Sequence, residues 1–218
     1  MTENNTIQFN FSYFALNLLG KQMYTNNWSA ISELIANSLD AGAANVKLYI
    51  ESIDKENSIL EILDNGSGMS YDDLTTKYAL IGRNRRLSNE ELSEKTKGRK
   101  GIGKLATLFL SKKYYIVSKK DGIESAWMLD STNASDSDIP ELIRVNIDDV
   151  CIENRDIWDS FESGTLIKSI GVNLVGFAEG KLDSLKMTLA NYYLLDNIGA
   201  DIEVAYKTKQ EQEIIFSK

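Results

Sequence analysis

The chain has 218 residues, 43% of them hydrophobic and 26% charged, which is typical of a globular protein large enough for one substantial domain. It contains one cysteine and no histidine, which excludes intrachain disulfides, cysteine metal clusters, histidine-ligated zinc, Ser-His-Asp triads and phosphohistidine chemistry within this chain. The net charge of -8 argues against a protein that coats nucleic acid. The lack of a long apolar run or a signal-peptide pattern predicts a cytoplasmic protein that makes no membrane contact.

Hydrophobic periodicity and turn residues predict an α+β fold. Helices are expected at 12–23 and 29–40, followed by strands at 45–52 and 58–63 that a DKEN turn joins. The remaining expected elements, in chain order, are a helix that Ser70 and Asp73 cap, a polar loop over 82–101 with a short helix near 89–94, a helix from about residue 102, strands at 114–119, 124–129, 143–147 and 164–170, a helix at 181–195, and strands at 201–206 and 212–216.

The helix expected over 29–40 carries a narrow polar stripe. At about 100° per residue, Glu33, Asn37 and Asp40 share a sector of roughly 60°, while the apolar side chains occupy the opposite face. Such a helix can bury its apolar face and present two carboxylates and a carboxamide to a pocket. These groups suit a site that holds a metal ion and activates a water molecule, although a hydrated surface helix explains them nearly as well.

A second motif, DNGSGM, begins where the strand over 58–63 ends. Asp64 can accept a hydrogen bond from an exocyclic amine. Gly66 and Gly68 have no Cβ and would let the backbone approach a flat ring, on which Met69 could pack. Asp-Asn-Gly is also a common turn sequence, so the motif alone fits a simple turn equally well. The dinucleotide-binding fingerprint is excluded because Tyr71 stands where its third glycine would be.

A basic segment spans residues 77–104, where nine basic and three acidic residues stand in an otherwise acidic chain. It ends in GRKGIGK, directly before an apolar helix pattern. Glycines that open a helix leave backbone N–H groups at its positive end, which suits polyphosphate binding. The P-loop pattern fails, because Leu105 replaces the magnesium-binding hydroxyl and no buried strand precedes the segment. A solvated loop and a nucleic-acid contact are the alternative interpretations.

Taken in order, these motifs resemble the GHKL superfamily, which comprises gyrase B subunits, ninety-kilodalton heat-shock chaperones, histidine kinases and MutL. The resemblance covers roughly residues 10–170 and includes SGT at 163–165. It implies a Bergerat-type ATP-binding fold, a layered α/β sandwich whose mixed, largely antiparallel sheet packs on helices. It also implies Mg²⁺-dependent ATP binding and hydrolysis by a single domain over 1–218, with an ATP lid at about 70–103.

The resemblance assigns roles to individual residues. Glu33 matches the general base that activates the attacking water, Asn37 the Mg²⁺ ligand, and Asp40 the carboxylate that contacts ribose and water. Asp64 matches the aspartate that selects adenine. Gly68 and Met69 are implied to line the base pocket, Thr165 to supply a distal adenine-side hydroxyl, and Gly98, Gly101, Ile102 and Gly103 to form the turn that holds the phosphates. Ala41, Gly66, Lys100 and Lys104 are also implied to bind the nucleotide.

Within the superfamily, IGRNRR (81–86) and GRKGIGKLA resemble the chaperone-like and MORC-like ATPases most closely, and the lack of histidine argues against a histidine kinase. Those ATPases dimerise on ATP and carry a second domain that supplies a lysine to the γ-phosphate. No such domain fits after residue 171, so the chain is expected to be the N-terminal module of a longer protein. The expected function is an ATPase whose lid closure gates homodimerisation or partner engagement. A non-catalytic ATP sensor and a DNA-associated ATPase clamp remain open.

Overall fold

The computed structural model describes residues 6–8, 12–15, 18, 24, 27–52, 57–79, 105–172, 187, 199–207 and 212–217. Its strands are β1 (Thr6–Gln8), β2 (Asn45–Glu51), β3 (Ile59–Asp64), β4 (Lys113–Lys120), β5 (Ile123–Asp130), β6 (Glu141–Val145), β7 (Gly164–Ile170), β8 (Asp201–Lys207) and β9 (Gln212–Ser217). Its helices are α2 (Asn27–Asp40), α3 (Tyr71–Asp73), the π-helix η1 (Leu74–Tyr78), α4 (Leu105–Leu110), the 3₁₀-helix η2 (Ile147–Asp149) and α5 (Arg155–Ser160).

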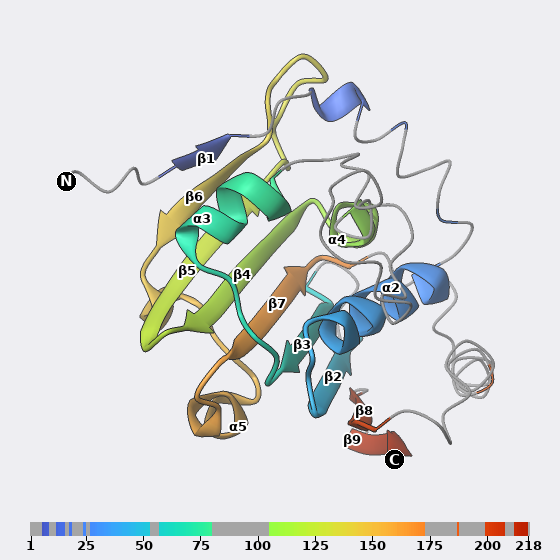
Figure 1. Ribbon diagram of the computed structural model, residues 1–218. Helices are drawn as coiled ribbons and strands as arrows, with labels where there is room; N and C mark the ends of the chain where they lie inside the picture. Colours follow the sequence, from blue (N-terminus) through green and yellow to red (C-terminus); the bar gives the residue numbers. More distant parts are fainter. Residues whose placement is uncertain are drawn as a thin grey trace, which may run out of the picture.

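The strands form one nine-stranded sheet in the order β1-β6-β5-β4-β7-β3-β2-β8-β9 (Figure 1). Strands β2 and β8 pair in parallel, and every other neighbouring pair in this sheet is antiparallel. This mixed, largely antiparallel sheet with packed helices confirms the predicted fold class. None of the helices in the described ranges has the length and apolar character needed to cross a membrane.

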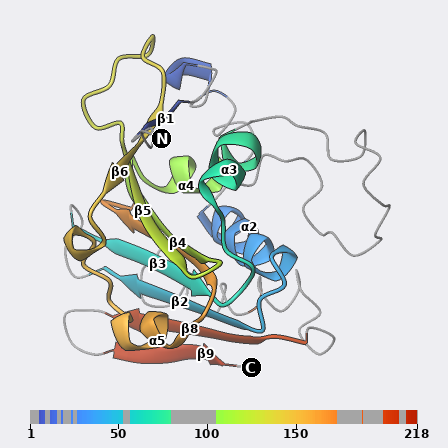
Figure 2. The same ribbon diagram turned by 60° about the vertical axis from the view of Figure 1, so that its left-hand side comes forward.

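The two faces of the sheet bury two separate apolar cores. On one face, α2 and α4 pack on side chains such as Leu48, Leu60 and Ile116. On the other face, Trp158 of α5 packs against Leu63 and neighbouring strand residues. Figure 2 shows α2, α3 and α4 on one side of the sheet and α5 on the other. Because side chains alternate along a strand, β3 sends Leu60, Ile62 and Asp64 toward α2.

Most predicted elements lie within two residues of their observed bounds. The cap predicted at Ser70 is confirmed, because Ser70 and Asp73 form a capping box at the start of α3. The strand predicted at 143–147 is displaced, since β6 ends at Val145 and Asn146 caps η2. Strand β1 and helix α5 were not predicted. The loop and helix expected over 82–101, most of the DKEN turn and most of the helices expected at 12–23 and 181–195 fall outside the described residues.

A buried ionic network joins β3 and β7 to the loop before α5, on the face away from α2. Glu61 has no exposed surface and accepts hydrogen bonds from the backbone N–H of Glu153 (2.9 Å) and from the backbone and side-chain amides of Asn154 (both 3.0 Å). Lys168 stands opposite Glu61 in the strand register, pairs with Glu153 at 2.8 Å and donates to the Cys151 carbonyl. The network therefore fixes the approach of α5 to the sheet.

We expect Glu61→Ala to lower the free energy of unfolding by about 3–5 kcal/mol, because it removes three hydrogen bonds to a buried carboxylate and leaves the partly buried donors of Glu153 and Asn154 unpaired. Glu61→Gln keeps an acceptor oxygen and should lose less. Urea denaturation monitored by tryptophan fluorescence measures both changes. A loss of less than about 1 kcal/mol for the alanine variant would contradict a structural role for this network.

Candidate active site

A cavity of about 310 Å³ lies between α2 and the neighbouring ends of β3, β4 and β7. This volume is in the range of small-molecule sites. The structure brings together eight of the predicted site residues on its walls: Glu33, Asn37, Asp40, Ala41, Asp64, Gly68, Met69 and Thr165. Gly66 stands behind Asp64, to which its N–H donates at 2.9 Å, and it is not part of the cavity wall. The predicted phosphate-binding residues Gly98 and Lys100–Lys104 fall outside the described residues.

Helix α2 is positioned by the apolar face that the sequence predicts. Ile31 and Ile35 have no exposed surface and belong to the main core. On the opposite side, Glu33 and Asp40 are half-buried and Asn37 is exposed, and all three line the cavity. The polar stripe therefore faces a cavity and not only bulk solvent.

Asp64 is a buried carboxylate on the cavity wall. It stands opposite Thr165 in the β3–β7 register, and the residue is only 5% exposed. Three donors converge on it: the Ser38 hydroxyl on Oδ2 at 2.8 Å, and the N–H groups of Gly66 and Thr165 on Oδ1 at 2.9 and 3.3 Å. Burial raises the pKa of Asp64 to about 6, although these hydrogen bonds oppose the shift.

Two glycines near Asp64 are required by close backbone contacts. Gly68 has a φ of +62°, and a Cβ there would lie 2.0 Å from the Lys119 carbonyl oxygen. Gly164 has a φ of +154°, and a Cβ there would lie 2.0 Å from the Asp64 carbonyl oxygen. At both glycines the backbone of a neighbouring strand therefore occupies the position that a Cβ atom would take. For Gly68 this packing is a reason for glycine in addition to the predicted one, the approach of a ligand ring, which stays a prediction because Gly68 also lines the cavity.

Comparison with known proteins identifies the family. A family model described as "Histidine kinase-, DNA gyrase B-, and HSP90-like ATPase" matches residues 24–165, more than half of the chain. The chain belongs to this family. ATP binding and hydrolysis are therefore the family activity of this ATPase domain, in agreement with the resemblance found in the sequence.

Three relatives are longer proteins that match the chain over part of their length. The chain is 34% identical over 124 residues to a protein named "Putative type II restriction enzyme HgiDII" from Herpetosiphon aurantiacus, a match that covers 56% of this chain and 20% of the relative. It is 28% identical over 151 residues to the chaperone protein HtpG of Rickettsia rickettsii (56% and 24% covered). It is 31% identical over 124 residues to the DNA mismatch repair protein MutL of Borreliella afzelii (56% and 20% covered). The matches thus span about a fifth to a quarter of these relatives.

Glu33 has the electrostatic environment of a proton acceptor. Burial raises the pKa of Glu33, and the nearby negative charge of Asp40 raises it further. A carboxylate with a raised pKa accepts a proton more readily at neutral pH than an ordinary surface glutamate. Glu33 is therefore a cavity carboxylate whose raised pKa is compatible with the predicted role of a base.

The same wall offers oxygen donors that suit a magnesium ion. Mg²⁺ prefers oxygen ligands and is commonly held by one or two protein groups together with substrate phosphates and water. The exposed carboxamide of Asn37 lies on the cavity between Glu33 and Asp40 on the helix face. Within the described ranges, no group of three or more histidine, cysteine, aspartate or glutamate residues is arranged as a metal site. A site shared between Asn37 and a bound triphosphate fits this donor set.

Sequence reasoning did not assign several polar residues of the cavity to the site, among them Ser38, Asp73, Lys77 and Lys120. A signal for Ser38 was available, because its helical angle places it on the apolar face of α2, where a hydroxyl needs a buried partner. Lys120 had no local signal, because only the pairing of β4 beside β7 brings the end of β4 to the cavity. Tertiary pairing, not local pattern, positions it.

We expect Ser38→Ala to weaken ATP binding by about fivefold to fifteenfold, because Asp64 loses a buried 2.8 Å hydrogen bond that fixes its carboxylate. Ser32→Ala is the matched control, since Ser32 is a buried serine of the same helix that does not line the cavity. Calorimetric titration with ATP compares the two variants. Equal affinities for Ser38→Ala and the wild-type chain would show that Ser38 does not support Asp64.

Proposed function

We propose that this cavity binds Mg²⁺ and ATP and that the domain hydrolyses the terminal phosphate. Asp64 accepts a hydrogen bond from the adenine amino group, Gly68, Met69 and Ala41 border the base, and Thr165 supplies a hydroxyl on the same side. The triphosphate extends toward the glycine-rich segment 98–104. The observation that carries this proposal is the buried Asp64 carboxylate, which three donors hold at the end of a cavity that also contains Glu33.

In this mechanism Glu33 orients the attacking water and takes its proton. Asn37 holds Mg²⁺ together with the phosphates, and Asp40 contacts the ribose and ordered water. When bound, the metal neutralises charge on the phosphate oxygens. The side chains on α2 contribute mainly by holding these groups in position, because phosphoryl transfer depends on orientation and charge more than on covalent chemistry.

The proposal extends to what hydrolysis controls. Residues of about 70–103 form a lid that closes over ATP, and closure gates association with a second copy or with a partner. The domain acts as the N-terminal module of a longer protein, whose downstream transducer domain completes the site. The small share of each relative that the chain matches supports a modular use of this domain.

The direct test is a calorimetric titration of the purified chain with ATP, ADP and GTP, with and without Mg²⁺, followed by an assay of phosphate release. We expect ATP and ADP to bind, GTP to bind at least tenfold more weakly, and Mg²⁺ to strengthen ATP binding. Phosphate release establishes the hydrolase. Binding without phosphate release at high protein concentration supports the alternative of a non-catalytic ATP sensor, and no binding rejects the site.

A second candidate function is that of a DNA-associated ATPase clamp. Two relatives carry names that refer to DNA mismatch repair or restriction, and residues 77–104 have nine basic and three acidic residues. This function predicts DNA binding by the chain that weakens steeply as salt rises from 50 to 200 mM, because phosphate contacts release counterions. Fluorescence anisotropy with a labelled duplex measures it. Salt-independent or absent binding rejects this second function for the domain.

A further inference from the structure

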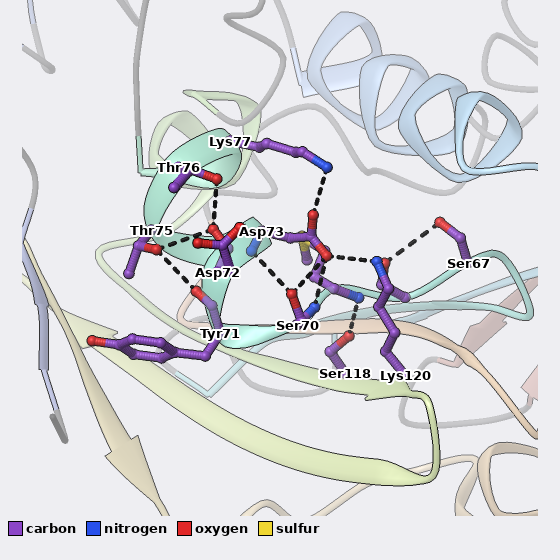
Figure 3. Close-up of polar contacts among 12 residues, drawn as sticks. Ser67, Ser70, Tyr71, Asp72, Asp73, Thr75, Thr76, Lys77, Ser118 and Lys120 are labelled. Carbon is purple, nitrogen blue, oxygen red and sulfur yellow. Dashed lines mark hydrogen bonds and ion pairs between the residues drawn. The ribbon is translucent and has the colours of Figure 1, made fainter. Parts of the chain in front are cut away.

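Asp73 is the centre of a charged cluster at the cavity. Its Oδ1 accepts from Lys77 Nζ at 2.6 Å, and its Oδ2 accepts from Lys120 Nζ at 2.6 Å and from the Ser70 hydroxyl at 2.8 Å (Figure 3). The Asp73 side chain is only 10% exposed. Although burial opposes ionisation, the hydrogen bonds from Lys120, Lys77 and Ser70 outweigh it and hold the pKa of Asp73 well below its usual range. The cluster is thus one carboxylate shared by two lysines.

This cluster provides positive charge to a cavity with acidic walls. The described residues that line the cavity include four carboxylates and two basic side chains, Lys77 and Lys120. Two ammonium groups on one carboxylate leave the cluster with a net charge of +1. A triphosphate carries several negative charges, so its binding favours any lysine that can leave Asp73 and approach it.

The two lysines differ in their freedom to move. Lys120 is the last residue of β4, and its side chain is 30% exposed. Lys77 comes from the π-helix η1, and its side chain is 65% exposed. Because most of the Lys77 side chain is in solvent, water and salt screen its ion pair with Asp73 more than they screen that of Lys120. π-Helical turns also often occur at functional sites. In Figure 3 the Lys77 side chain extends from η1 toward the side where α2 lies, whereas Lys120 reaches Asp73 from the sheet.

We infer that Lys77 is a phosphate-binding residue, which exchanges Asp73 for the phosphate chain of the bound nucleotide while Lys120 remains on Asp73. This inference rests on the proposed function of the cavity. Lys120 and Ser70 keep Asp73 and the start of α3 fixed when Lys77 departs, so the exchange changes one ion pair without releasing the helix.

The test compares nucleotides with and without phosphates. We expect Lys77→Met to weaken ATP binding about tenfold or more, to weaken ADP binding less, and to leave adenosine binding unchanged. Lys77→Arg keeps the cation and should retain most of the preference for ATP over adenosine. The control is Lys113→Met, which removes an ion-paired lysine (35% exposed) that lies at the far end of β4 from Lys120 and does not line the cavity. Calorimetry with ATP, ADP and adenosine measures these ratios.

Each outcome separates this inference from the proposed function. If the wild-type chain binds ATP and Lys77→Met leaves the ATP-to-adenosine ratio unchanged, the inference fails and the proposed function stands. The inference also fails if Lys77→Met loses as much affinity for adenosine as for ATP. It fails as well if Lys113→Met loses as much ATP affinity as Lys77→Met. If the wild-type chain does not bind ATP, both fail together. An unchanged melting temperature of Lys77→Met shows that any loss of affinity arises in the folded domain.

Discussion

Glu33→Gln is expected to lower the rate of ATP hydrolysis by about two to four orders of magnitude and to change ATP affinity by less than about threefold. Glutamine keeps the size of the side chain and its place on α2 but cannot accept a proton from the attacking water. Glu33 lies on the cavity wall, and its pKa is raised by burial and then by Asp40. Single-turnover phosphate release and calorimetric titration measure the two effects separately.

The same carboxylate sets a pH dependence. Because the pKa of Glu33 is raised, protonation removes the base at a higher pH than the ordinary value of 4.5, and turnover should fall as pH drops through that raised pKa. Glu203→Gln is the control, since it removes a carboxylate that pairs with Lys47 and does not line the cavity. Hydrolysis by Glu33→Gln at the wild-type rate would show that another group is the base.

The fold was predictable where one local pattern decides the structure. Successive side chains of residues 164–170 point to opposite faces of the sheet, and these residues form β7 with the predicted bounds. Helix α5 has six residues, too few for local propensity to reveal. Its stability comes from Trp158, which has no exposed surface and donates its indole N–H to Glu124 at 2.7 Å. This contact joins residues far apart in the chain, so the periodicity around 155–160 does not indicate it.

The site shows the same division between local pattern and tertiary contact. The α2 stripe follows from helical period alone, and Asp64 follows from its place at the end of β3. The donors around Asp64 do not, because Ser38 and Thr165 reach it only through the packing of α2 and the register of β7. Lys77 is near Asp73 in sequence, yet only β4 brings Lys120 to the same carboxylate. Sequence therefore identifies the reactive groups, and the sheet supplies the groups that hold them.

Asp64→Asn is expected to weaken ATP binding at least about 100-fold. The amide oxygen can keep the N–H donors of Gly66 and Thr165, and the amide nitrogen can donate to the Ser38 hydroxyl in place of Oδ2. The fold therefore tolerates the substitution. The group offered to the adenine changes from an acceptor to a donor, however, and two donors cannot pair. Calorimetric titration with ATP measures this loss.

A stability measurement distinguishes this loss from misfolding. Because the pKa of Asp64 is about 6 in the folded chain and 3.8 ordinarily, the stability that Asp64 contributes is full below about pH 4 and is lost as the pH rises through 6. Asparagine carries no charge to bury, so at pH 8 the nucleotide-free Asp64→Asn variant should melt no lower than the wild-type chain. ATP should raise the melting temperature of the wild-type chain only. Tight ATP binding by the variant would place the adenine away from Asp64, whereas a lower melting temperature without nucleotide would mean that the carboxylate stabilises the fold.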